Sequence, residues 1–130
     1  MAGKITVSTI NDSSGVLATQ NGMTGIAKAW VNYNAGTQTI NASFNISSVT
    51  YGSVGNYTLN FTTAMPSANY AWSGGSGLNN ANQNQYVTLP RNVALTTSKT
   101  TTTLQVQCVY ANLSTVNVDS DNLSVIVIGA

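Results

Sequence analysis

The segment that decides the fold reads Ala27-Lys28-Ala29-Trp30-Val31-Asn32-Tyr33. In an extended chain its residues at positions 27, 29, 31 and 33 share one face, and Lys28, Trp30 and Asn32 share the other. A period of two residues predicts a β-strand with one face buried. The same period recurs at positions 57, 59 and 61, where Tyr, Leu and Phe alternate with polar residues. This repetition favours a protein built from sheets.

Further strand signals follow at fairly regular spacing. Apolar residues alternate at positions 40, 42, 44 and 46 and again at 104, 106, 108 and 110, and shorter segments lie at 49–51, 70–72, 86–96 and 123–128. Pro90 interrupts 86–96, which predicts an edge strand or a split one. Residues 125–128 are apolar on both faces, so we expect burial on both sides, in the core or between subunits. The whole predicts an all-β fold, an antiparallel, jelly-roll-like β-sandwich of about eight strands.

Composition divides the chain into two parts. Residues 1–25 are expected to form an N-terminal strand or arm followed by a linker, because Ile5 and Val7 alternate with polar residues and a Ser-, Gly-, Asn- and Thr-rich stretch follows. Residues 26–130 are expected to form the sandwich domain. A chain of this length has enough residues for one core without a metal or disulfide.

Charge is scarce. Charged residues make up 5% of the chain and its formal charge is +1, with the four basic residues scattered. This pattern argues against nucleic-acid binding, which needs a basic stripe. No apolar run approaches the about 18 residues of a membrane span. The first residues do not resemble a signal peptide, so synthesis in the cytoplasm is expected.

The side chains of ordinary catalysis are nearly missing. The chain has no histidine, so a Ser–His pair or an imidazole metal site is excluded, and we expect no catalytic residue, metal or cofactor. Asp119 and Asp121 favour turn chemistry, with a calcium site or a glycosidase pair as alternatives. Cys108, in phase with apolar neighbours, is expected to be buried. The segment Gly74-Gly75-Ser76-Gly77 is expected to be a flexible turn.

The aromatic residues supply candidate binding positions. Tyr70, Trp72 and Tyr86 flank a loop-like segment, 73–85, that is rich in Gly, Asn and Gln and includes Asn82. Such rings stack on sugars or fill a partner's pocket, although packing in the core is an equal alternative. For Trp30, packing in the core or at a subunit interface is favoured. The candidate assembly residues are Ile5, Val7, Trp30, Ile126 and Ile128.

Three segments together resemble a known module. They read AKAWVNYN at 27–34, ASFNISSVT at 42–50 and GNYTLNFTTAMPSANY at 55–70. They resemble a module of tailed bacteriophages, especially of aquatic and cyanobacterial hosts, that occurs in virion structural and tail-fibre-like proteins. The module usually has Gly-Thr-Gly after the first motif, where this chain has Ala35-Gly36-Thr37. Longer members carry a fibre shaft before the module, which this chain does not show.

The resemblance implies a non-enzymatic structural protein of the virion and a homotrimer. The small size and short N-terminal arm favour a capsid decoration or cement protein that forms a knob on the head and contacts the major capsid protein. The alternative is a tail-fibre tip that contacts tail components and a host-surface glycan or protein. An enzyme acting on host polysaccharide is disfavoured because carboxylates are so few.

Overall fold

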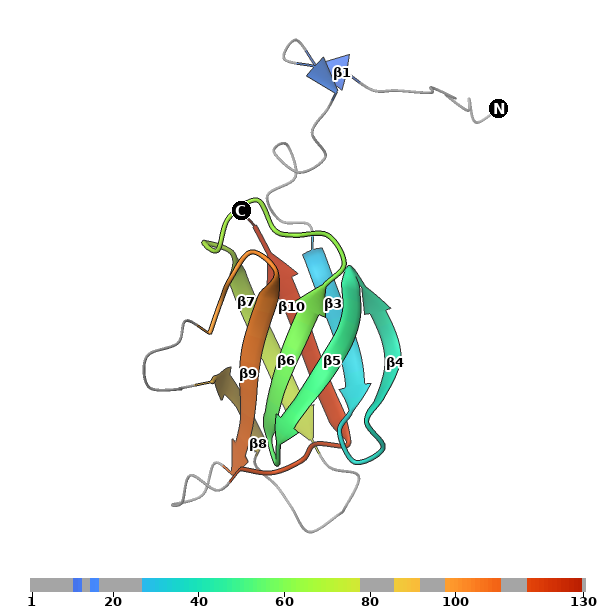
Figure 1. Cartoon of the computed structure of the whole chain (residues 1–130), viewed down its shortest axis with the longest axis vertical. Coiled ribbons are helices and arrows are strands. Elements are labelled where there is room, and N and C mark those ends of the chain that lie inside the picture. The colour runs from blue at the N-terminus through green and yellow to red at the C-terminus, as the bar shows by residue number, and fades with distance from the viewer. Residues whose placement is uncertain are drawn as a thin grey trace, which may run out of the picture.

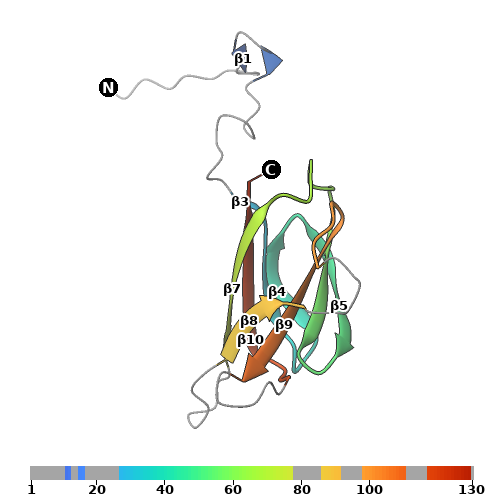
Figure 2. The same ribbon diagram turned by 90° about the vertical axis from the view of Figure 1, so that its left-hand side faces the viewer.

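The computed structural model describes residues 11–12, 15–16, 27–77, 86–91, 98–110 and 117–129. Within these residues there is no helix, and two antiparallel sheets of four strands face each other (Figure 1 and Figure 2). The strands are β3 (Ala27–Asn34), β4 (Thr39–Phe44), β5 (Ile46–Ser53), β6 (Asn56–Phe61), β7 (Ala71–Gly77), β8 (Tyr86–Pro90), β9 (Thr103–Tyr110) and β10 (Asn122–Ile128). The predicted all-β antiparallel sandwich is confirmed, whereas the jelly-roll path is not.

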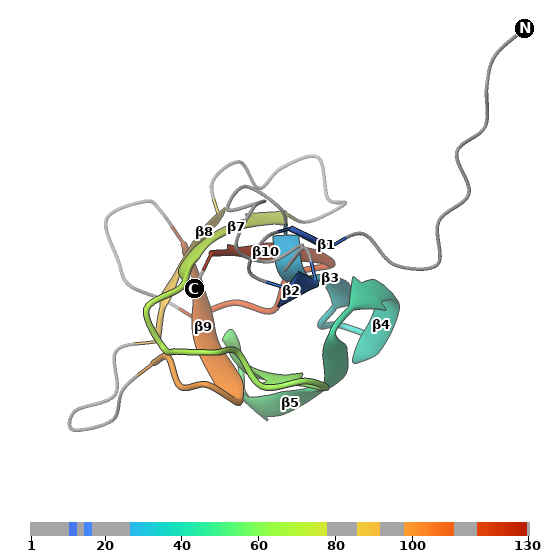
Figure 3. The same cartoon turned by 90° about the horizontal axis from the view of Figure 1, so that it is seen from above.

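In each sheet the two edge strands are far apart in the sequence. One sheet has the order β4-β3-β10-β7 and the other has the order β5-β6-β9-β8. Seen from above, β7, β10 and β3 lie opposite β5, and β9 and β4 lie at the two flanks (Figure 3). Two further short strands, β1 (Asn11–Asp12) and β2 (Gly15–Val16), pair with each other within the segment expected to be a linker.

The core forms where the alternating residues of the two sheets meet. The predicted inner faces of the 57–61 and 104–108 segments are buried, and so is that of 27–33 except for Ala27, which is partly buried at the start of β3. The four central strands contribute Ala29, Val31 and Tyr33; Leu123, Val125 and Val127; Tyr57, Leu59 and Phe61; and Leu104, Val106 and Cys108. Tyr33 and Tyr57 contact each other edge to face across the two sheets, with ring centroids 5.8 Å apart. This arrangement follows from the period of two in each strand.

One strand does not follow its predicted phase. Ile40 lies partly buried against the core, but Ala42 and Phe44 are exposed on the opposite face, and Phe44 is 54% exposed. The register between β3 and β4 shifts at a bulge beside Asn41, where Tyr33 pairs with Ile40 and Asn32 pairs with Ala42. One extra residue in a strand turns every following side chain to the other face. The expected common face of 40, 42, 44 and 46 is therefore wrong.

Asn45 explains why the chain leaves this strand for the other sheet. Its φ of 55° lies in the left-handed region, which Asn tolerates better than most residues. Its side-chain amide donates to the backbone carbonyl oxygens of Lys28 and Thr63, and its side-chain oxygen Oδ1 accepts from the Thr63 backbone amide at 2.7 Å. Because Lys28 belongs to β3 and Thr63 follows β6, Asn45 ties the two sheets together.

Two predictions about the ends of the sheets have different outcomes. The expected flexible turn at Gly74–Gly77 is wrong, because these residues form the second half of β7 and pair with β10. Their small size suits a strand here, since a Cβ on Gly74 would lie 2.9 Å from the Thr88 side chain. The interpretation of Pro90 is confirmed, because β8 is the outermost strand of its sheet.

Candidate functional site

Two of the predicted binding residues, Tyr70 and Trp72, lie inside the sandwich. Tyr70 is 1% exposed, its hydroxyl donates to the Thr100 and Thr103 carbonyls, and burial raises its pKa to about 12. Trp72 points inward beside Val127 and packs on the core. Strand alternation places Trp72 inside, and Tyr70, which directly precedes β7 (Ala71–Gly77), is buried as well, so the expectation that Tyr70 presents a binding surface is wrong. Asn82 lies outside the described residues, and Tyr86 is described only as part of β8.

The predicted assembly residues do not all lie in one place. Ile5 and Val7 lie outside the described residues. Trp30 and Ile126, which are 96 positions apart in the sequence, are direct partners in the β3–β10 register. Their side chains are 39% and 40% exposed on the outside of the β4-β3-β10-β7 sheet. Ile128 lies partly buried at the end of β10.

Phe44 completes this group, and the sequence analysis missed it. It is the partner of Trp30 in the β3–β4 register and the most exposed large apolar side chain described. The outward side chains of β4, β3, β10 and β7, centred on Phe44, Trp30 and Ile126, are here called the apolar face. No sequence signal marks Phe44 as outward, because the bulge beside Asn41 is invisible to a count of alternate residues.

The apolar face has an ordered layout of two neighbouring rows that cross its four strands. The first row, here called the apolar row, contains Phe44, Trp30, Ile126 and Ser73, in the strand order β4-β3-β10-β7. The second row, here called the polar row, contains Ala42, Asn32, Ser124 and Gly75 in the same order.

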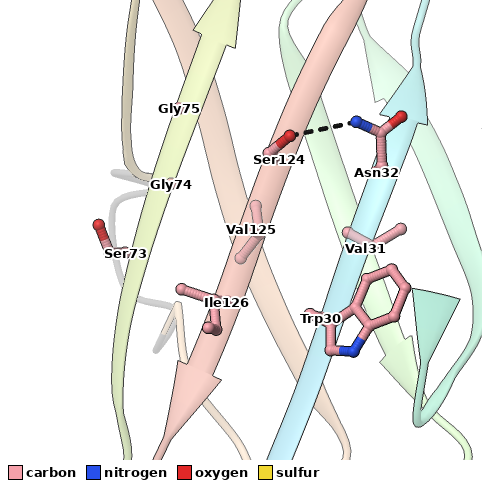
Figure 4. Close-up of a pocket in the computed structure, with 9 residues that line it drawn as sticks. All are labelled: Trp30, Val31, Asn32, Ser73, Gly74, Gly75, Ser124, Val125 and Ile126. Atoms are coloured by element: carbon pink, nitrogen blue, oxygen red, sulfur yellow. Dashed lines mark hydrogen bonds between the residues drawn. The ribbon is translucent and has the colours of Figure 1, made fainter. Parts of the chain in front are cut away.

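A shallow trench of about 400 Å³ runs between these rows (Figure 4). Trp30, Ile126 and Ser73 line one side of it, and Asn32, Ser124 and Gly75 line the other. The backbone of Val31, Val125 and Gly74 forms its floor, because the two valine side chains point into the core. The trench therefore has one largely apolar wall and one polar wall.

The polar row is hydrogen-bonded within the chain. The Asn32 side-chain amide donates to the Asn122 side-chain oxygen at 2.9 Å and to the Ser124 hydroxyl at 3.3 Å, the latter drawn in Figure 4. The Asn32 side-chain oxygen accepts from the Asn41 amide at 2.8 Å. These bonds fix the orientation of the amides before anything binds.

The electrostatics of the apolar face are simple. Lys28, at the start of β3, is the only charged residue among the four strands that form it. The trench is lined by no ionisable side chain. A neutral surface of this kind favours an uncharged partner and a contact that depends weakly on salt.

Of the two predicted carboxylates, Asp119 has a structural role. One oxygen of this carboxylate accepts from the Tyr57 hydroxyl at 2.8 Å and from the Gly55 amide at 2.9 Å, and the other accepts from the Tyr51 hydroxyl at 2.9 Å. Burial, then the bond to Asp119, raises the pKa of Tyr57. Asp119 thus ties the segment before β10 to the β5–β6 turn. No group of three or more His, Cys, Asp or Glu suited to a metal occurs in the described part of the chain.

Cys108 is buried as predicted, with its side chain at 0% exposure. The Thr88 hydroxyl lies 3.9 Å from its sulfur. Burial is the main cause that raises the pKa of this thiol. A buried thiol with a raised pKa is a packing residue, because reactivity requires the thiolate and access to solvent.

Comparisons with family models, with curated proteins and with solved structures found no match to this chain. Among the described residues there is also no helix long and apolar enough to span a bilayer. The apolar face is therefore the candidate site on its own geometry.

Proposed function

We propose that this chain is a non-enzymatic structural protein of a tailed-bacteriophage virion, most simply a capsid decoration protein that forms a homotrimeric knob on the head. Two things support the proposal: the resemblance of residues 27–70 to a virion module, and the apolar face. The apolar face is the observation that carries it. A row of exposed Phe44, Trp30 and Ile126 on a rigid sheet is a surface suited to burial against a protein.

A homotrimeric knob has to form by burying surface between its copies. Burying apolar area contributes roughly 25 cal/mol per Å², so a face with two aromatic rings and an isoleucine is suited to the centre of an interface. Because Lys28 is the only charged residue on the four strands of this face, a contact made through it is expected to survive moderate salt. The chain would act in the virion after synthesis in the host cytoplasm.

The proposal is tested on intact particles. Gold-labelled antibody against the chain, viewed by electron microscopy with copy number counted, is expected to show many copies over the head. Particles washed at about 1 M salt, where the screening length falls to roughly 3 Å, should keep the label. Label confined to the tail would contradict the decoration role, and particles without label would contradict a virion role altogether.

A second function, a tail-fibre tip that binds a host glycan, is favoured by the trench. The trench places the Trp30 ring opposite the Asn32 amide and the Ser124 hydroxyl, and aromatic rings with polar handles are typical of sugar sites. A glycan array tests this function, with Trp30→Ala as the variant and Leu89→Ala as the control on the other sheet. Binding lost in the first and kept in the second would support it, and an array without hits would oppose it.

A further inference from the structure

The apolar face has two unlike halves. Its β4–β3 half carries the bulky Phe44 and Trp30 in the apolar row, whereas its β10–β7 half carries Ile126 and Ser73 there and Gly75 in the polar row. A Cβ on Gly75 would meet nothing within 4 Å, so the space above it is open. A protruding half and a recessed half thus lie side by side on one surface.

Reversing the apolar row pairs large residues with small ones. Read from β4 to β7 the row is Phe44, Trp30, Ile126 and Ser73, and a second row laid over it in the opposite direction sets Phe44 against Ser73 and Trp30 against Ile126. The polar row behaves in the same way, with Ala42 against Gly75. Surfaces that complement themselves in this manner are what contacts between identical chains require.

The polar groups of the apolar face are ready for burial. Asn32 already donates to Asn122 and Ser124 and accepts from Asn41. Burying a polar group is costly mainly when it loses its partner, and these partners are supplied by the same chain. A covering surface therefore does not need to provide matching hydrogen bonds, and the polar row of another copy, whose own polar groups are paired in the same way, can lie over it.

We propose that a second copy of this chain covers the apolar face, with the Phe44–Trp30 half of one copy on the Ile126–Ser73–Gly75 half of the next. This inference rests on the proposed function, because it names the partner through which the virion knob assembles. The relation closes as the three-fold ring of the proposed knob, since each bulky half meets the small half of the next copy. Repulsion between copies is weak, with a formal charge of only +1 on each chain.

The test exchanges the two residues that are proposed to meet. The variants are Phe44→Ser, Ser73→Phe and the double variant that carries both, which has the composition of the original chain. Within one chain these positions are three strands, or about 14 Å, apart, so their side chains do not meet there. Any recovery in the double variant therefore comes from contact between copies.

Sedimentation velocity of the purified chain over about 1 to 100 μM measures the result. The wild-type chain is expected to associate, and each single variant is expected to weaken association by roughly 10- to 30-fold, the effect of losing or blocking a central aromatic residue. The double variant is expected to recover most of the loss. Leu89→Ser, which changes a residue that is 40% exposed on the other sheet, should leave association unchanged.

Three results would overturn the inference: a wild-type chain that stays monomeric at 100 μM, a Phe44→Ser variant that associates like wild type, or two weakened single variants without recovery in the double variant. Circular dichroism of each variant confirms that loss of association is not loss of folding. Particle labelling separates the two proposals. Association through this face without label on particles would refute the virion role alone, and label on particles with a monomeric chain would refute this inference alone.

Discussion

In both sheets every second side chain points outward, but the outward side chains of one sheet are largely apolar and those of the other are largely polar. The β4-β3-β10-β7 sheet turns Phe44, Trp30 and Ile126 outward. The β5-β6-β9-β8 sheet turns hydroxyl and amide side chains outward instead, namely Ser48, Thr50, Thr58, Asn60, Thr103, Gln105 and Gln107, with Leu89 at its edge strand. Both sheets bury their inner faces equally well, so the difference is unrelated to the core.

The comparison separates stability from association. Side chains on the polar outer face hydrogen-bond to one another, as Asn60 shows by donating to the Ser48 and Thr50 hydroxyls at 3.0 Å each. Rings on the apolar face gain free energy only when water is removed from them. We therefore expect changes on the apolar face to act on assembly, and changes between the sheets to act on folding.

The largest expected effect comes from removing the Asp119 carboxylate, which links the segment before β10 in one sheet to β5 and β6 in the other. Asp119→Ala removes a carboxylate that accepts three hydrogen bonds and leaves the Tyr57 hydroxyl without its 2.8 Å partner. We expect the free energy of unfolding, measured by urea denaturation, to fall by about 3 kcal/mol. Tyr51→Phe removes only one of the three bonds and should lower the free energy of unfolding by less than Asp119→Ala does. A loss below about 1 kcal/mol for Asp119→Ala would show that the hydrogen bonds of Asp119 do not hold the two sheets together.

Neighbouring glycines in β7 provide the next effect, because one faces the core and the other faces the trench. A Cβ on Gly74 would lie 2.9 Å from Cγ2 of Thr88, whereas a Cβ on Gly75 would touch nothing. Gly74→Ala is expected to lower the free energy of unfolding by about 2 kcal/mol through overpacking. Gly75→Ala is expected to leave it unchanged or slightly raised. Equal losses at the two positions would mean that the trench is not open.

Much of the sandwich follows from the sequence, and its exceptions have physical causes. The inner faces of β3, β6 and β9 were predictable because each strand keeps a strict period of two. Phe44 was not, because a bulge beside Asn41 reverses the phase of the strand. The 125–128 segment was expected to be buried on both faces, and in the single chain only the side with Val125 and Val127 is buried, with Ile126 exposed.

The candidate site was predictable only in part. Trp30 and Ile126 were named as assembly residues, and their contact across β3 and β10 depends on a strand order that spacing alone does not give. For Tyr70 and Trp72 the sequence left binding and core packing as equal alternatives, because proximity to a loop says little about which way a side chain points, and both pack on the core. The trench needs Gly75, whose role as an open position appears only when the neighbouring strands are in place.

A smaller effect on stability, which depends on pH, is expected from Tyr70, whose ring is buried inside the sandwich, unlike the exposed rings of Trp30 and Phe44. Burial raises the pKa of Tyr70 from its ordinary value of 10 to about 12, so the neutral hydroxyl is favoured in the folded chain. Its contribution to stability is complete below pH 10 and is lost as the pH rises from 10 through 12, amounting to about 1 kcal/mol by pH 11. Urea denaturation at pH 8 and pH 11 measures the loss. Tyr70→Phe should reduce the difference between the two pH values, and an unchanged difference would assign it to another group.

The smallest effect compares one asparagine from each outer face. Asn32→Ala and Asn60→Ala each remove side-chain hydrogen bonds at an exposed strand position, and each should lower the free energy of unfolding by less than about 1 kcal/mol. Only Asn32→Ala is expected to weaken association as well, because under the covering copy it removes the acceptor of the Asn41 amide and one of the two donors to Asn122. Sedimentation velocity measures the effect on association, and urea denaturation of the same samples measures the effect on the free energy of unfolding. If Asn60→Ala weakened association as much as Asn32→Ala, the polar face would be part of the interface and the contrast between the faces would not hold.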